Sequence, residues 1–137
     1  MKVVIDTNVL VSALLKRDSV PGRILRAVWE GNLELLLSAP LREELAAVME
    51  YPKIKKRLVA LGVESAPFLD LLPFFTTEVG IGDVAVTMPR DADDQMVLAS
   101  LVAGLGDWLI TGDKDLLELQ NQCAILTPAA FVDRFLS

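Results

Sequence analysis

Acidic side chains follow the short apolar runs of this sequence, and they are the groups best suited to chemistry. Asp6 directly follows the first apolar run, and Asp113 lies two residues beyond a later one. Glu44 lies one helical turn into the segment after another such run, while Asp91 and Asp94 lie three residues apart where a helix is expected to start. Because ligands bind outside the carboxyl ends of parallel strands, these positions predict that the carboxylates meet at one sheet edge.

Each acid also has an ordinary structural explanation when it is taken alone. Asp6 and Asp91 could cap the helices that follow them, because Asp is a favoured N-cap residue. Glu44 could lie on a solvated helix face. Capping does not explain, however, why Asp6 and Asp113 both come after apolar strands and close to hydroxyl side chains such as that of Thr111.

Carboxylates that meet in this way need a counter-charge. Two like charges about 4 Å apart repel by roughly 4 kcal/mol at an effective dielectric constant of about 20. The chain contains no histidine, which excludes serine–histidine and cysteine–histidine nucleophiles. All-oxygen ligands favour Mg²⁺ or Mn²⁺. Because such ions activate water and stabilise phosphodiester transition states, phosphodiester hydrolysis is the favoured reaction class.

Short apolar strands that alternate with helices must position these acids. We expect strands over residues 3–5, 35–37, 108–111 and 124–126, and helices over residues 8–16, 22–30, 41–49, 54–61, 65–72, 89–103, 113–119 and 128–135. Residues 74–88 have no clear assignment. This order predicts an α/β fold, a three-layer α/β/α sandwich with a central parallel sheet of four or five strands, in a single domain over residues 1–137. Gly112 is expected to allow a sharp turn before Asp113.

Composition narrows the setting in which the protein works. Met1 leads straight into the first strand, so we expect no signal peptide. No apolar run reaches the roughly 18 residues of a membrane span. The single cysteine, Cys123, fits a reducing compartment. These features predict a cytoplasmic protein with no membrane partner.

One dense basic run lies in the middle of the chain, although the net charge of −6 argues against a broad nucleic-acid-binding surface. Its members are Lys53, Lys55, Lys56 and Arg57. They either form a solvated helix face or contact phosphate groups of a substrate. Trp29, Trp108 and Cys123 are expected to pack in or against the core.

Four motifs in order resemble those of the PIN-domain family. They are VVIDTNVL at residues 3–10, SAPLREEL at 38–45, RDADD at 90–94 followed by Leu98 and Ala99, and LITGDKDLL at 109–117. The resemblance covers nearly the whole chain. Within the family, the chain is similar to stand-alone prokaryotic members described as toxins of toxin–antitoxin pairs.

The resemblance implies roles for individual residues. The catalytic and metal-binding acids would be Asp6, Glu44, Asp94 and Asp113, with Asp91 as a further metal ligand and Asn8, Thr111, Asp93 and Asp115 as supporting groups. It also implies cleavage of single-stranded RNA with Mg²⁺ or Mn²⁺, a homodimer or higher homo-oligomer, and a cognate antitoxin. Gly112 departs from the arginine or larger residue of many toxins, and residues 52–88 contain no motif for a target sequence.

Other functions remain as alternatives. The chain could be a non-catalytic module that binds RNA or protein on the same fold. A response-regulator phosphoacceptor would need an acidic pair near the first strand, but Thr7 and Asn8 follow Asp6. A haloacid-dehalogenase-like phosphatase would need an aspartate at position 8.

Overall fold

The structure is a computed structural model that describes residues 1–80 and 92–136, with the side chains of residues 92–96 outside its description. Its described strands form one parallel sheet in the order β3-β2-β1-β4-β5. The strands are β1 (Lys2–Ile5), β2 (Glu34–Ser38), β3 (Thr76–Val79), β4 (Trp108–Ile110) and β5 (Ile125–Leu126). The predicted α/β fold with a parallel sheet is therefore confirmed.

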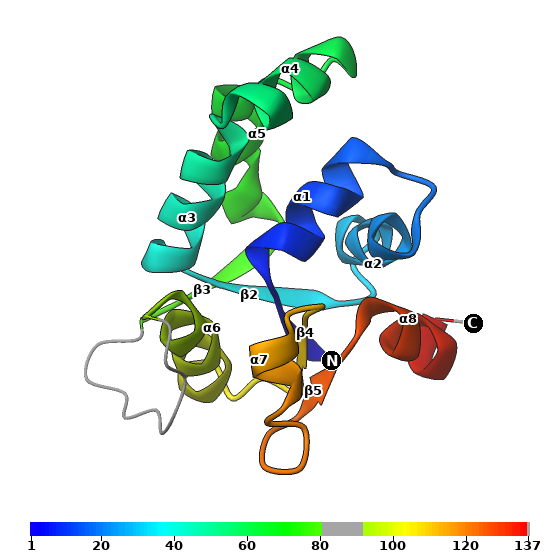
Figure 1. The fold of residues 1–137 in the computed structure, drawn as a ribbon, viewed down its shortest axis with the longest axis vertical. Helices are drawn as coiled ribbons and strands as arrows, with labels where there is room; N and C mark the ends of the chain where they lie inside the picture. The colour runs from blue at the N-terminus through cyan, green and yellow to red at the C-terminus, as the bar shows by residue number, and fades with distance from the viewer. Residues whose placement is uncertain (81–91, 137) are drawn as a thin grey trace.

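Helices cover both faces of this sheet. They are α1 (Thr7–Leu15), α2 (Val20–Trp29), α3 (Ala39–Met49), α4 (Pro52–Ala60), α5 (Ser65–Leu71), α6 (Ala92–Ala103), α7 (Lys114–Leu117) and α8 (Pro128–Phe131), with a 3-10 turn at Leu72–Phe74 and a π-helical turn at Val132–Leu136. Figure 1 shows α1 and α2 on one side of the sheet and α6 on the other, while α3, α4 and α5 extend from the β2–β3 end. No described helix has the length and apolar character needed to cross a bilayer.

Local capping signals explain where several helices begin. The hydroxyls of Ser19, Ser38 and Thr127 each accept a hydrogen bond from the backbone N–H three residues later, at 3.1, 3.4 and 3.1 Å respectively. A proline lies in the first turn of each of these helices. The two features satisfy or remove N–H groups that a helix start leaves without partners. The predicted starts are accordingly correct to within a few residues.

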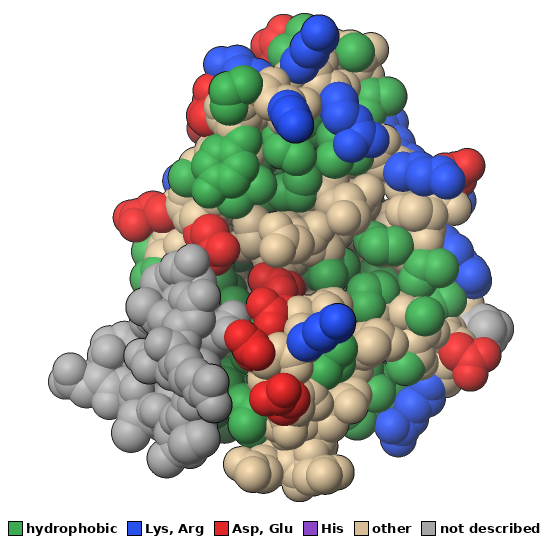
Figure 2. Space-filling view, in the orientation of Figure 1, with side chains coloured by type: hydrophobic (Ala, Val, Ile, Leu, Met, Phe, Trp, Pro, Cys, Tyr) green, Lys and Arg blue, Asp and Glu red, His purple; other side chains and the backbone are tan. Residues whose placement is uncertain are grey.

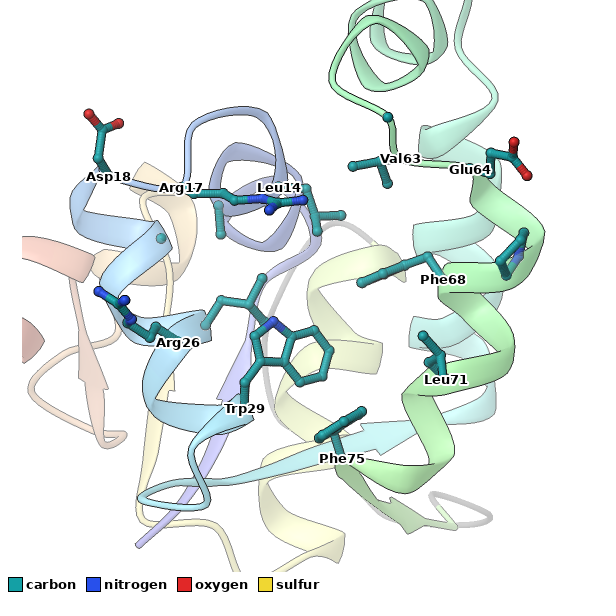
Figure 3. A pocket seen from close by; sticks show the side chains of 15 residues that line it. Leu14, Arg17, Asp18, Arg26, Trp29, Val63, Glu64, Phe68, Leu71 and Phe75 are labelled. Carbon is teal, nitrogen blue, oxygen red and sulfur yellow. The ribbon is translucent and has the colours of Figure 1, made fainter.

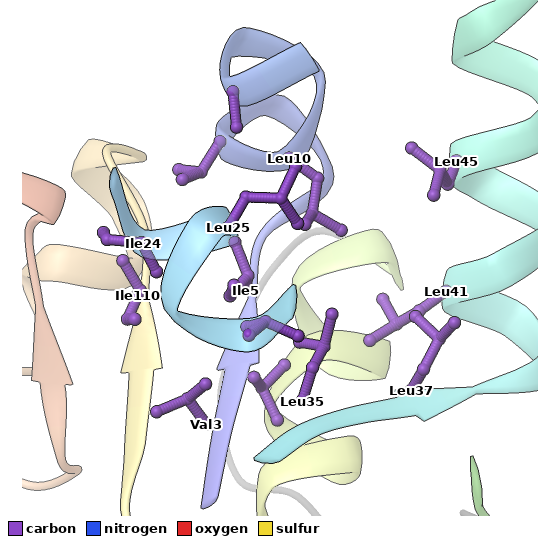
Figure 4. Packing of buried hydrophobic residues seen from close by; sticks show 14 of the residues in the cluster. Val3, Ile5, Leu10, Ile24, Leu25, Leu35, Leu37, Leu41, Leu45 and Ile110 are labelled. Carbon is purple, nitrogen blue, oxygen red and sulfur yellow. The ribbon is translucent and has the colours of Figure 1, made fainter. Parts of the chain in front are cut away.

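The core lies on both faces of the central strands. Val3, Val4 and Ile5 of β1 are buried, which explains their continuous apolar run. Figure 4 shows side chains of α1, α2 and α3 packed around β1 and β2. Trp29, Trp108 and Cys123 pack against this core as partly buried residues, as the sequence predicts.

Strand β3 fills part of the segment that had no assignment. It pairs with β2 in the register Leu35↔Thr76 to Ser38↔Val79. The side chains of β3 are half-buried or exposed, so the run lacks the apolar signal of a central strand. The remainder of that segment, from residue 81, lies outside the described residues, as do the first residues of the helix predicted from residue 89.

The expectation for Gly112 is wrong. Among the described glycines, positive φ angles occur at Gly31 and Gly62, which lie just beyond α2 and α4, and not at Gly112. A Cβ atom at Gly112 would meet nothing within 4 Å. The turn before Asp113 therefore needs neither the conformational freedom nor the small size of glycine.

Candidate active site

The parallel pairing of β1 with β4 brings Asp6 and Thr111 together. Ile5 and Ile110 are register partners, so the next residue of each strand lies at the same sheet edge. The Asp6 N–H donates to the Ile110 carbonyl at 3.0 Å. The Thr111 hydroxyl donates to Asp6 Oδ2 at 2.7 Å, and both residues are buried. This contact fixes the orientation of a buried carboxylate.

Asp6 does not use its carboxylate to cap α1. It occupies the N-cap position, yet its side chain makes no capping hydrogen bond. Its backbone carbonyl instead accepts from the N–H groups of Val9 and Leu10, both at 3.0 Å. The simple capping explanation for Asp6 is therefore wrong, and its carboxylate is held toward β4.

Thr111 also connects Asp6 to Asp113. The Asp113 N–H donates to Thr111 Oγ1 at 3.0 Å, so this hydroxyl donates to one acid and accepts from the backbone of the other. Asp113 Oδ1 accepts from the Asp115 N–H at 2.8 Å and caps α7. Asp113 is half-buried, while Asp115 is exposed. Asp115 thus contributes a backbone contact that orients Asp113.

Two buried serines connect the helices that carry the other predicted acids. Ser38, at the end of β2, caps α3, and the Ser100 hydroxyl of α6 donates to Ser38 Oγ at 2.8 Å. Both side chains are almost completely buried. Glu44 lies on α3, half-buried, with its Oε2 atom buried. The cap at Ser38 has a local sequence signal, but nothing in the sequence pairs it with Ser100.

The remaining predicted residues are placed less completely. Asp93 and Asp94 lie in the first turn of α6, which packs along β1, β2 and β4, but their side chains lie outside the description. Asp91 lies outside the described residues altogether. Asn8 is exposed in the first turn of α1, where its carbonyl accepts from Ser12. The basic residues Lys53, Lys55, Lys56 and Arg57 are exposed on α4, which lies beyond α3 and away from the sheet (Figure 1).

The donors at this sheet edge have the chemistry that a hard divalent cation prefers. Figure 2 shows several Asp and Glu side chains close together at the centre of one face. Among the side chains that the structure describes, no three acidic, histidine or cysteine residues form a group able to hold a metal ion. Asp6 and Asp113 are therefore the described acids that hydrogen bonds through Thr111 bring together, while the described side chain of Glu44 lies on α3.

Thr111→Val provides a test of this pair. The substitution removes the donor to Asp6 and the acceptor for the Asp113 N–H, and we expect it to lower the free energy of unfolding by about 2–3 kcal/mol. Thr111→Ser keeps the hydroxyl and should lose about 1 kcal/mol or less, through the missing methyl group. Urea unfolding measures both. Equal losses in the two variants would show that the hydroxyl contacts contribute little.

An apolar groove of about 760 Å³ lies apart from these acids. Figure 3 shows Trp29 of α2 facing Phe68 and Phe75, with Leu14 near the end of α1. The rings of Trp29 and Phe75 have centroids 4.4 Å apart. Leu14 lies roughly 11 Å along α1 from its first residue, and none of the described candidate acids lines the groove. The groove is therefore a separate surface.

Comparisons with known proteins show which family this chain resembles. The family model described as "PIN domain" matches residues 2–115. An uncharacterized protein of Methanocaldococcus jannaschii is 31% identical over an alignment of 146 residues. The alignment covers 98% of this chain and 92% of the relative. No solved structure matches the chain.

Proposed function

We propose that this chain, which belongs to the PIN domain family, is a metal-dependent endoribonuclease that hydrolyses phosphodiester bonds of single-stranded RNA. The family has a nuclease-type fold, and its members are generally nucleases. The observation that carries the proposal is the hydrogen-bonded group of Asp6, Thr111 and Asp113 at the carboxyl edge of the sheet. Ligands bind at this edge in parallel α/β folds.

The residues that would hold Mg²⁺ or Mn²⁺ are Asp6, Glu44, Asp94 and Asp113, with Asp91 as a further ligand. When bound, the ion supplies charge neutralisation at the scissile phosphate and activates water for attack. Without it, the carboxylates would repel a phosphodiester, so the reaction requires the ion.

The chain itself contributes the orientation of the acids. Thr111 holds the Asp6 carboxylate before any substrate arrives, and the backbone of Asp115 holds that of Asp113. Preorganised groups of this kind need little rearrangement during the reaction. The Ser38–Ser100 contact extends the same role to the relative placement of α3 and α6.

Cleavage of a labelled single-stranded RNA with Mg²⁺, with Mn²⁺ and with a chelator tests the proposal. We expect cleavage with at least one ion, none with the chelator, and a lower rate on double-stranded RNA. Mapping the products gives the preferred sequence. RNA binding without cleavage under every condition would instead favour a non-catalytic module on the same fold.

Family membership also supports the proposals that the chain binds a protein antitoxin and that it forms a homodimer or higher homo-oligomer. Expression of the chain with its neighbouring genes, followed by light scattering on the purified material, tests both. A monomer with no copurified partner would contradict them.

A further inference from the structure

Helix α4 carries a concentration of positive charge in an acidic chain. Four of the chain's 13 lysines and arginines lie in its nine residues, which include no acid, although the net charge of the chain is −6. All four are exposed. The helix packs inward through Leu58, which is buried, and Ile54, which is half-buried. The basic side chains therefore lie around its solvent-facing surface.

The four basic residues differ in the side of the helix on which they lie and in whether they form an ion pair. Lys53, Lys56 and Arg57 have the i, i+3, i+4 spacing of side chains on one flank. Lys55 lies on another flank, and its Nζ is 2.7 Å from Glu50 Oε2. The hydrogen bond from Lys55 lowers the pKa of Glu50. No described carboxylate lies within ion-pair distance of the other three cations. Three charges on one flank are thus available to an anionic partner.

A strand that starts at the candidate acids can reach this flank by following α3 and then α4. Helix α4 follows α3, which carries Glu44, after a short turn, and the two helices extend one after the other in Figure 1. Figure 2 shows Lys and Arg side chains gathered over α4, on the same face as the central acids. At about 1.5 Å per residue, the path along α3 and α4 from Glu44 to Arg57 is roughly 20 Å long. For a single strand that keeps the stacked spacing of about 3.4 Å per phosphate, that length corresponds to about six nucleotides.

We propose that Lys53, Lys56 and Arg57 form a phosphate-binding flank that holds single-stranded RNA over about six nucleotides on one side of the scissile bond. Lys55 does not take part, because its charge is paired with Glu50. This inference rests on the proposed function, since the strand starts at the candidate acids. In this inference α4 contributes to RNA binding, while hydrolysis takes place at the sheet edge that carries Asp6 and Asp113.

Binding of fluorescent single-stranded RNAs of 4 to 16 nucleotides tests the flank in an Asp6→Asn background, which prevents cleavage during the measurement. Affinity should rise with length up to about ten nucleotides and then level off. The triple variant Lys53→Ala, Lys56→Ala, Arg57→Ala should lose this rise. Its slope of log affinity against log salt should fall by about 2, because each phosphate contact on a single strand contributes about 0.7. Lys55→Ala, the matched control on the same helix, should leave the slope unchanged.

Equal effects of Lys55→Ala and of any single change on the flank would overturn the inference, as would a triple variant with unchanged length and salt dependence. Equally tight, length-dependent binding of single-stranded DNA would overturn the assignment to RNA. Circular dichroism establishes that the variants are folded.

Cleavage assays with RNAs of two lengths distinguish a failure of this inference from a failure of the proposed nuclease function. A tetranucleotide is too short to reach the flank, so the wild type and the triple variant should cleave it at the same rate, while a 16-nucleotide RNA should be cleaved more slowly by the variant at low concentration. If no RNA of any length is cleaved, the proposed nuclease function fails. The binding series still decides whether the flank holds RNA.

Discussion

Asp6→Asn should lower kcat/KM for RNA cleavage by about 10³-fold or more while the protein stays folded. The carboxylate is the charged group that Thr111 orients at the sheet edge, and a metal site supplies several kcal/mol of transition-state stabilisation. A loss of about 4 kcal/mol corresponds to roughly 10³-fold. The amide oxygen of asparagine can still accept the Thr111 hydrogen bond, so the melting temperature should change by only a few degrees.

Asp107→Asn is the matched control. Asp107 precedes β4 at the opposite edge of the sheet, where its Oδ2 accepts from the Lys2 N–H at 2.7 Å. The same substitution therefore changes an acid that contacts the same pair of strands at their other end. Its kcat/KM should match the wild type within about twofold, and only Asp6→Asn should weaken the binding of Mn²⁺ in calorimetry. Full activity of Asp6→Asn would contradict the assignment of the site.

Gly22→Ala should destabilise the protein strongly for a change of one methyl group. A Cβ atom at this position would lie 2.2 Å from the carbonyl oxygen of Arg17 and 2.6 Å from its carbonyl carbon. These are backbone atoms, so relief requires movement of the connection between α1 and α2. That movement would also disturb the cap in which Ser19 accepts from the Gly22 N–H. We expect a loss of about 2–4 kcal/mol in the free energy of unfolding.

Gly112→Ala, at a glycine beside the candidate site, should not lower the free energy of unfolding. Nothing lies within 4 Å of the position that its Cβ atom would take, and its φ is not positive. Alanine should therefore be neutral or stabilise the protein by up to about 1 kcal/mol through the unfolded state. Thermal and urea unfolding compare the two variants directly. Similar stabilities for Gly22→Ala and Gly112→Ala would contradict the close approach at Gly22.

Much of the fold could be predicted from local patterns. Apolar runs such as that of β1 mark buried strands, and Ser19, Ser38 and Thr127 mark helix starts, because both signals act within a few residues. Strand β3 lacks such a signal, since its side chains are half-buried or exposed. Its existence depends on hydrogen bonds to β2, a segment about 40 residues earlier in the chain.

The candidate site divides in the same way. That Asp6 and Asp113 follow apolar strands of a parallel sheet could be read from the residues alone, because strand ends can be recognised locally. That one hydroxyl, the one of Thr111, connects them became visible in the folded chain, since the contact depends on the register of β1 with β4. The Ser38–Ser100 contact depends likewise on how α6 packs against β2. The local sequence determines which acids and hydroxyls end each strand. The Ser38–Ser100 and Asp6–Thr111 hydrogen bonds join residues that are separated by 62 and by 105 positions in the chain, so they depend on the packing of the whole chain.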